Sequence, residues 1–112
     1  MISLSSHVLD TTLGKPAANM PLTLSTPEGQ SIDALTDADG RCNNWQDSQF
    51  KACQFHAGVY QLRFHTKAYL LTHHQKAFYP FVDIHFELEE NGGHYHVPLL
   101  ISPYGFSSYR GS

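Results

Sequence analysis

The sequence predicts an all-β fold, a β-sandwich of about eight short strands with one short helix. Five stretches alternate apolar and polar residues with the period of a half-buried strand, and turn residues separate them at short intervals. One segment, around residues 66–76, lacks this alternation and has a helical composition. Hydrophobic residues form 41% of the chain and include six Tyr, seven Phe and one Trp, enough to fill a core between two sheets.

Each alternating stretch collects its apolar residues on one face, which we expect to point into the core. In chain order, these stretches and faces are 4–10 with Leu4, Ser6 and Val8; 21–26 with Leu22 and Leu24; 59–65 with Tyr60, Leu62 and Phe64; 81–88 with Val82, Ile84, Phe86 and Leu88; and the late strand 94–101. In the first stretch the opposite face carries Ser5, His7 and Leu9. The face of that strand opposite to the core therefore carries His7.

The segments between these stretches give three further expectations. The helix around 66–76 should end before Pro80, because proline interrupts helical hydrogen bonding. The sequence "ENGG" (90–93) lies between two alternating stretches, and its Asn and Gly tolerate a tight primed turn, so it predicts a hairpin. Pro98 interrupts the last stretch and favours an edge strand, or a strand that begins near it.

Length and charge restrict the classes of protein and partner. The 112 residues predict a single domain, 1–112. A net charge of −3 gives no electrostatic reason to bind nucleic acid or anionic membrane. No apolar run approaches the ~20 residues of a membrane span. The first ten residues have no basic region followed by an apolar one, which predicts a cytoplasmic protein, or a periplasmic one if a leader has been removed.

Two compositional features concern assembly and redox state. Charged residues are 15% of the chain, below the roughly 25% of ordinary soluble domains, which suggests that other subunits cover part of the surface. Cys42 and Cys53 allow one disulfide without requiring it, and two thiols are too few for a disulfide framework. Reduced structural cysteines are therefore expected.

Histidines and one arginine are the candidate functional residues, and each has an ordinary alternative. His94 and His96 share a strand face, which suits proton transfer or metal binding but also suits a plain polar face; a zinc site would need a third protein ligand. Arg41 follows the turn sequence "DADG", where an arginine is usually solvated, although its planar donors also suit binding of a carbonyl or oxyanion. A lone histidine such as His7 is more often a satisfied surface or core residue than a catalyst.

The C-terminal sequence "HYHVPLLISPYGFSSYRGS" closely resembles the signature of 5-hydroxyisourate hydrolases, transthyretin-related enzymes of ureide metabolism. "LSSHVLDTTLGKPA" resembles the family's opening strand, "TDADGR" its Asp-Gly-Arg turn, and "GVYQLRFHTKAYL" with "AFYPFVDIHFEL" its central strand–helix–strand unit. The resemblance covers essentially the whole chain. It departs from the family pattern at Ile101, Phe106 and Ser108, where Leu, Tyr and Thr are usual, and none of these positions carries the expected chemistry.

The resemblance implies a site and an assembly. Position by position, His7, Arg41 and His96 match the family's catalytic residues, and Tyr109, Arg110, Gly111 and Ser112 match its closing tetrapeptide, which contributes to substrate binding. The family is a transthyretin-like sandwich that forms a homotetramer, a dimer of dimers, with its pockets at a subunit interface. No cofactor and no metal are required by this chemistry, although clustered imidazoles could capture zinc opportunistically.

The implied reaction is hydrolysis of 5-hydroxyisourate at an amide-type C–N bond of the oxidised purine ring, giving 2-oxo-4-hydroxy-4-carboxy-5-ureidoimidazoline. His7 and His96 would jointly activate water and return a proton, because imidazole titrates near neutral pH, while Arg41 would polarise the carbonyl. Which histidine is the base stays open. Two alternatives remain: a transthyretin-type carrier of a small ligand, and a metal-binding or purely structural sandwich module.

Overall fold

The fold is built from two packed sheets and one helix. The computed structural model describes residues 2–43, 45 and 55–111. In chain order the elements are β1 (Ser3–Asp10), β2 (Lys15–Pro16), β3 (Pro21–Ser25), β4 (Ser31–Leu35), β5 (Arg41–Cys42), β6 (Gly58–Phe64), α1 (Lys67–His74), β7 (Val82–Leu88), β8 (His94–Ser102) and β9 (Gly105–Ser108). The predicted sandwich with one short helix is confirmed. The described residues form nine strands, two of which have only two residues.

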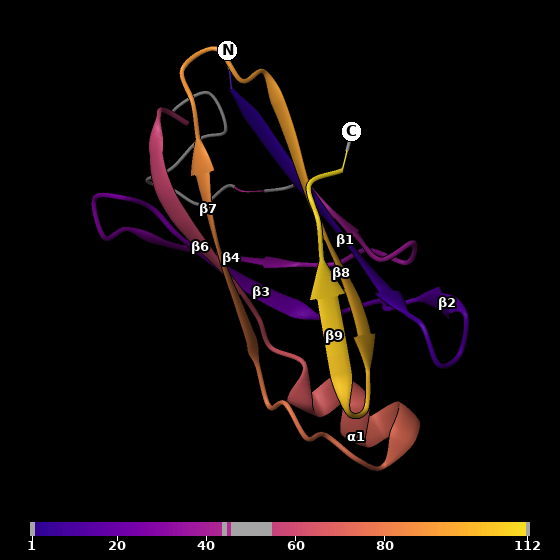
Figure 1. Ribbon diagram of the computed structural model, residues 1–112. Helices are drawn as coiled ribbons and strands as arrows, with labels where there is room; N and C mark the ends of the chain where they lie inside the picture. The colour runs from indigo at the N-terminus through magenta and orange to yellow at the C-terminus, as the bar shows by residue number, and fades with distance from the viewer. Residues whose placement is uncertain (1, 44, 46–54, 112) are drawn as a thin grey trace.

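The two sheets divide the strands unequally. One sheet runs in the order β2-β1-β8-β9, with β5 also paired to β1, and the other in the order β4-β3-β6-β7 (Figure 1). β1 and β8 pair in parallel over eight positions, whereas the other strand pairs are antiparallel. Both ends of the chain lie on the side of the molecule away from α1 (Figure 1). This topology places the first strand at the centre of one sheet, between β5 and β8.

The core lies between the sheets and follows the predicted alternation. Every second residue of β1 is buried, and Leu22, Leu24, Leu62 and Phe64 of the opposing sheet are fully buried. β8 adds the apolar side chains Tyr95, Val97, Leu99 and Ile101 to the same core. The opposite faces of β1 and β8 are consequently outside the core and available for polar side chains.

Helix α1 agrees with the segment expected from composition. It spans Lys67–His74 and buries Tyr69 and Leu70 against the sandwich. It stops at Gln75, which adopts a left-handed backbone conformation with φ of 60° and returns its N–H to the Leu71 carbonyl, so it ends well before Pro80. No described helix is long and apolar enough to cross a membrane.

The hairpin expected at "ENGG" is wrong. A turn does form there, since the Gly92 N–H donates to the Glu89 carbonyl at 3.0 Å, but β7 and β8 belong to different sheets. The segment therefore crosses from one layer of the sandwich to the other. The Tyr95 hydroxyl accepts the Glu89 N–H at 2.9 Å and holds this crossing against β8. Turn residues such as Asn and Gly reverse the chain both in a hairpin and in a crossing between two sheets. They therefore do not decide whether the flanking strands pair.

The expectation that Pro98 marks an edge strand or a strand start is also wrong. β8 begins at His94 and is interior, between β1 and β9. The Pro98 carbonyl points toward β9, because it accepts the Ser108 hydroxyl at 2.7 Å. The N–H and C=O of one strand residue point to the same side. The missing donor thus faces the gap between the last ladder pair, Leu99 and Ser108, and the isolated bridge of His96 with Gly111, where the regular ladder is already interrupted.

Candidate active site

The three predicted catalytic residues lie on adjacent strands of one sheet. β1 is flanked by β5 and β8, and the registers pair His7 with Arg41 on one side and Ser5 with His96 on the other. His7, Ser5 and His96 belong to the outward faces of their strands, as the burial alternation shows. The structure therefore brings the cation and the two imidazoles together on one face, although 89 residues separate His7 from His96 in the sequence.

The turn before Arg41 is fixed to β1 by hydrogen bonds. The Asp37 carboxylate accepts the Asp39 and Arg41 N–H groups at 2.9 and 3.0 Å, and the Val8 N–H donates to the Gly40 carbonyl at 2.8 Å. Gly40 has φ of +76°, and a Cβ there would lie 2.5 Å from the Val8 carbonyl oxygen. Only glycine allows this close approach, so the "DADGR" turn places Arg41 beside the first strand.

His7 is oriented by the same turn. Its Nε2 lies 2.9 Å from the Asp39 carbonyl oxygen, which only accepts hydrogen bonds, so Nε2 carries the hydrogen. The other ring nitrogen, Nδ1, is then the atom of neutral His7 that can accept a proton or a hydrogen bond. The centres of the His7 and His96 rings are 6.4 Å apart, close enough for one water molecule to contact a nitrogen of each.

His96 has the properties of a base that is neutral at physiological pH. Its Nδ1 lies 2.7 Å from the Ser5 hydroxyl, and Nε2 has no hydrogen-bond partner among the described residues. The pKa of His96 is lowered from the ordinary histidine value, chiefly because partial burial disfavours the charged ring. The nearby charges of His7, His94 and Arg41 lower the pKa further.

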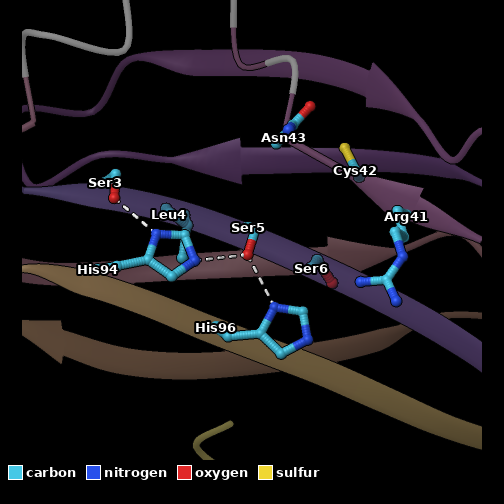
Figure 2. Close-up of a pocket in the computed structure, with 9 residues that line it drawn as sticks. All are labelled: Ser3, Leu4, Ser5, Ser6, Arg41, Cys42, Asn43, His94 and His96. Atoms are coloured by element: carbon cyan, nitrogen blue, oxygen red, sulfur yellow. Dashed lines mark hydrogen bonds between the residues drawn. The ribbon is translucent and has the colours of Figure 1, made fainter. Parts of the chain in front are cut away.

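A cavity of about 470 Å³ lies over this face of the sheet. Figure 2 shows the side chains of β1 and β8 meeting across it, with Arg41 reaching toward it from β5. Its lining residues are Ser3, Leu4, Ser5, Ser6, Arg41, Cys42, Asn43, His94 and His96. His7 is not among the lining residues, although its ring faces His96. Among the described residues no three His, Cys, Asp or Glu side chains are grouped as metal ligands.

The C-terminal tail lies against His96. The Gly111 N–H donates to the His96 carbonyl at 2.8 Å, and these two residues form a bridge in the register of the β8–β9 ladder. A Cβ at Gly111 would lie 2.5 Å from His96 Cδ2. Arg110 stacks over the Tyr95 ring, with its central carbon 4.4 Å from the ring centre. The tail is thus held by specific contacts to β8.

Tyr109 and Arg110, which were expected to contribute to the substrate site, lie outside the first cavity. Tyr109 and Arg110 line a second cavity of about 490 Å³, which also contacts β7 and the inner residues Tyr95 and Val97. Tyr109 is 56% exposed. Within one chain, the tail residue that contacts His96, and through it the first cavity, is Gly111, while Tyr109 and Arg110 line the second cavity. Ser112 and Cys53 lie outside the described residues, whereas Cys42 is buried in β5.

Sequence reasoning missed four polar residues of the cavity: Ser3, Ser5, Ser6 and Asn43. The alternation of residues 4–10 already placed Ser5 on the face of His7. Its contact with His94 and His96 depends on the parallel register between β1 and β8, which joins the two ends of the chain. No local signal in the sequence reports that register.

Comparison with known proteins identifies the family. Residues 4–111 match the model of the HIUase/Transthyretin family. The chain belongs to this family. A 5-hydroxyisourate hydrolase of Mesorhizobium japonicum is 44% identical over 117 residues, which cover 97% of this chain and 91% of that protein. The 5-hydroxyisourate hydrolase of Pseudomonas aeruginosa is 38% identical, with 97% and 90% covered.

Solved structures of the HIUase/Transthyretin family include both kinds of protein that its name mentions. The Klebsiella pneumoniae 5-hydroxyisourate hydrolase is similar over 100% of both chains, with a TM-score of 0.82 and 33% identity. Transthyretin from Sparus aurata is similar over 97% of this chain and 96% of its own, with a TM-score of 0.81 and 32% identity. The fold likeness does not separate the two, so the choice of activity depends on the relatives in sequence and on the side chains of the site.

Proposed function

We propose that this protein hydrolyses 5-hydroxyisourate, opening the oxidised purine ring at an amide-type C–N bond in urate degradation. The observation that carries the proposal is the convergence of His7, Arg41 and His96 on one outward sheet face, in a chain up to 44% identical to proteins named 5-hydroxyisourate hydrolase. A carrier of a small ligand has no use for a cation and two imidazoles in this arrangement. The protein is an enzyme, a hydrolase that binds a small-molecule substrate.

The chemistry requires an activated water, a polarised carbonyl and a proton for the leaving nitrogen. His96 Nε2 takes a proton from water, because its lowered pKa keeps the ring neutral at pH 7. His7 Nδ1 accepts the water's other hydrogen as a hydrogen bond and so orients the attacking oxygen. The hydroxide adds to the carbonyl carbon, the C–N bond breaks, and the proton on His96 passes to the nitrogen. The product carries a carboxyl group and a ureido group.

Arg41 acts on the carbonyl side of the reaction. A guanidinium is always protonated at neutral pH and presents planar donors, so it stabilises the oxyanion that forms when water adds. Its position opposite His7 on β1 places that charge at the same face as the base. The same charge disfavours an imidazolium at His96 and thereby keeps the base in its reactive form.

The terminal residues Tyr109, Arg110, Gly111 and Ser112 are proposed to bind the substrate. The contact between Gly111 and His96 supports this role, because it places a residue of this tetrapeptide beside the base. Tyr109 and Arg110 lie at a second cavity in one chain, so their part in binding would come through an assembled form.

The proposed assembly is a homotetramer, a dimer of dimers, with the site at a subunit interface. The low charged fraction of 15% and the exposure of Phe78, Tyr104 and Phe106 support a surface that other subunits cover. Sedimentation equilibrium of the untagged protein measures this directly. A mass four times the 12.6 kDa of the chain is expected, and a monomer at assay concentration would contradict the proposal.

The test of the function is an ultraviolet assay with 5-hydroxyisourate generated freshly from urate. The substrate decays by itself, so the observable is acceleration over that background. Wild type should accelerate the decay, and His96→Ala should lose about 10²- to 10⁴-fold, the usual worth of general acid–base catalysis. His65→Ala is the matched control, because His65 lies beyond β6 and bonds Thr23 on the other sheet. A wild type that gives no acceleration would refute the function.

A further inference from the structure

Three side chains form one continuous hydrogen-bonded network with the proposed base, His96. Ser3 Oγ lies 2.6 Å from His94 Nδ1, His94 Nε2 lies 3.0 Å from Ser5 Oγ, and Ser5 Oγ lies 2.7 Å from His96 Nδ1 (Figure 2). The parallel register pairs Ser3 with His94 and Ser5 with His96, and the period of two puts all four on the outward face. The order along the chain is Ser3–His94–Ser5–His96.

Counting hydrogens shows that the tautomers of the two rings depend on each other. A serine hydroxyl has one hydrogen, and a neutral imidazole carries a hydrogen on one nitrogen only. When His94 bonds Ser3 through a protonated Nδ1, its Nε2 accepts the Ser5 hydrogen, and Ser5 then accepts from His96 Nδ1. This polarity leaves His96 Nε2 with a free lone pair, the form that the base needs. Among the described residues, Ser5 is the side chain that links the His94 ring to the His96 ring by hydrogen bonds.

The two rings differ in how well they tolerate positive charge. His94 is exposed to solvent, whereas His96 is half-buried. The charged or titratable groups that face His96 are His7 of β1, His94 of β8 and Arg41 of β5, and all of them disfavour an imidazolium there. Charge is less costly on a ring that water can solvate. The favourable place for a proton's charge is therefore His94 rather than His96.

We propose that Ser5 relays protons between His96 and His94, so that the positive charge formed when His96 takes a proton from water resides on the exposed His94 ring. This inference rests on the proposed hydrolysis for its role in catalysis. Ser5 and His94 are positioning residues, since they act on the reaction through His96.

The relay balances in both directions. As water's O–H bond breaks, its hydrogen joins His96 Nε2, the Nδ1 hydrogen of His96 passes to Ser5 Oγ, and the Ser5 hydrogen passes to His94 Nε2. His94 is then an imidazolium that still donates from Nδ1 to Ser3. When the leaving nitrogen takes the hydrogen on His96 Nε2, each proton moves back by one bond. All four groups return to their starting state, and the reaction consumes no further reagent.

The first arm of the test needs no substrate. Long-range ¹H–¹⁵N spectra of the wild type report the tautomer and the titration of each imidazole. We expect Nδ1–H tautomers at His94 and His96, lost from His96 in Ser5→Ala and retained in Ser5→Thr, which keeps the hydroxyl. Unchanged ring ¹⁵N shifts of both histidines in Ser5→Ala would overturn the relay, whatever the enzyme does.

The second arm is kinetic. Ser5→Ala should lower kcat about 10- to 100-fold, the loss typical when a partner that orients a functional imidazole is removed, with KM changed less than about twofold. Ser5→Thr should restore most of kcat, and His94→Gln should resemble Ser5→Ala. A kcat of Ser5→Ala equal to wild type, or a loss carried by KM alone, would overturn the relay. Absence of wild-type activity would refute the proposed function while the spectra still decide the relay.

Discussion

The contact between the tail and the base gives the sharpest prediction, for Gly111→Ala. A Cβ at Gly111 would lie 2.5 Å from Cδ2 of the His96 ring, with Cγ at 3.2 Å and Cβ at 3.3 Å. These distances are far below ordinary carbon–carbon contacts of about 3.5–4.0 Å. Either the tail or the imidazole must therefore move by about 1 Å to accept one methyl group.

Each way of relieving the clash has a calculable cost. If the tail moves, the bond from the Gly111 N–H to the His96 carbonyl weakens, which costs about 0.5–1.5 kcal/mol of folding free energy. If the ring moves, the 2.7 Å contact with Ser5 opens and the base leaves its position. A misplacement of about 1 Å costs on the order of 10²-fold in rate. We expect kcat/KM to fall by about that factor with a stability loss no greater than about 1.5 kcal/mol.

Two measurements and a matched variant test this prediction. Activity is followed by the decay of 5-hydroxyisourate, and stability by urea unfolding with the fluorescence of Trp45, the single tryptophan, which is fully buried. Gly105→Ala is the control, because Gly105 lies in β9 and a Cβ there meets only Ser102 Oγ at an ordinary 3.7 Å. Gly111→Ala with wild-type kcat/KM would refute the idea that the tail fixes the base.

Three further outcomes are expected. Gly40→Ala should lose more activity and stability than Gly29→Ala. Both glycines have positive φ, but only at Gly40 would the added Cβ collide with backbone atoms. Equal urea midpoints and equal rates for the two variants would contradict this. Tyr69→Phe should cost about 1.5–3 kcal/mol in urea unfolding at pH 7, since the buried Asp10 carboxylate loses a donor. Burial raises the pKa of Asp10, but its hydrogen bonds lower it overall, so the cost should shrink as pH falls through that lowered pKa. A constant cost down to pH 2–3 would count against that linkage. The acidic limb of the kcat/KM profile should lie below pH 6.5, because the pKa of His96 is lowered from that value and the protonated ring cannot act as a base. A limb above pH 6.5 would exclude His96 as the base.

Local patterns were sufficient for the helix and for five strands, β1, β3, β6, β7 and β8, with their faces. Leu22 and Leu24 are fully buried, and so are Leu62 and Phe64, because period-2 alternation has one physical cause, a sheet with a single apolar side. The helix was predictable from the absence of that alternation. The strand β4 (Ser31–Leu35) was missed, since its burial pattern offers one buried residue, Ile32, and no repeated apolar face.

Long-range pairing could not be read from the sequence. Tight-turn residues at 90–93 describe a chain reversal equally well within one sheet or between two, and the structure uses the second. The same limit concealed the site: β1 and β8 pair in parallel although almost the whole chain lies between them. The roles of Ser3 and Ser5 follow from that register alone. The expected catalytic residues came instead from a family resemblance, and their roles stay predictions.

The division between core and site separates stability from chemistry along the same strands. Along β1 the buried residues Leu4, Ser6 and Val8 alternate with outward residues that include Ser5 and His7 of the site, and β8 repeats the pattern with His96. Substitutions on the outward face remove little buried apolar area, so variants such as Ser5→Ala should stay folded. Loss of activity in them then reports chemistry and not unfolding. By the same reasoning, outward side chains can change without altering the sandwich, which agrees with TM-scores of 0.82 to a 5-hydroxyisourate hydrolase and 0.81 to a transthyretin.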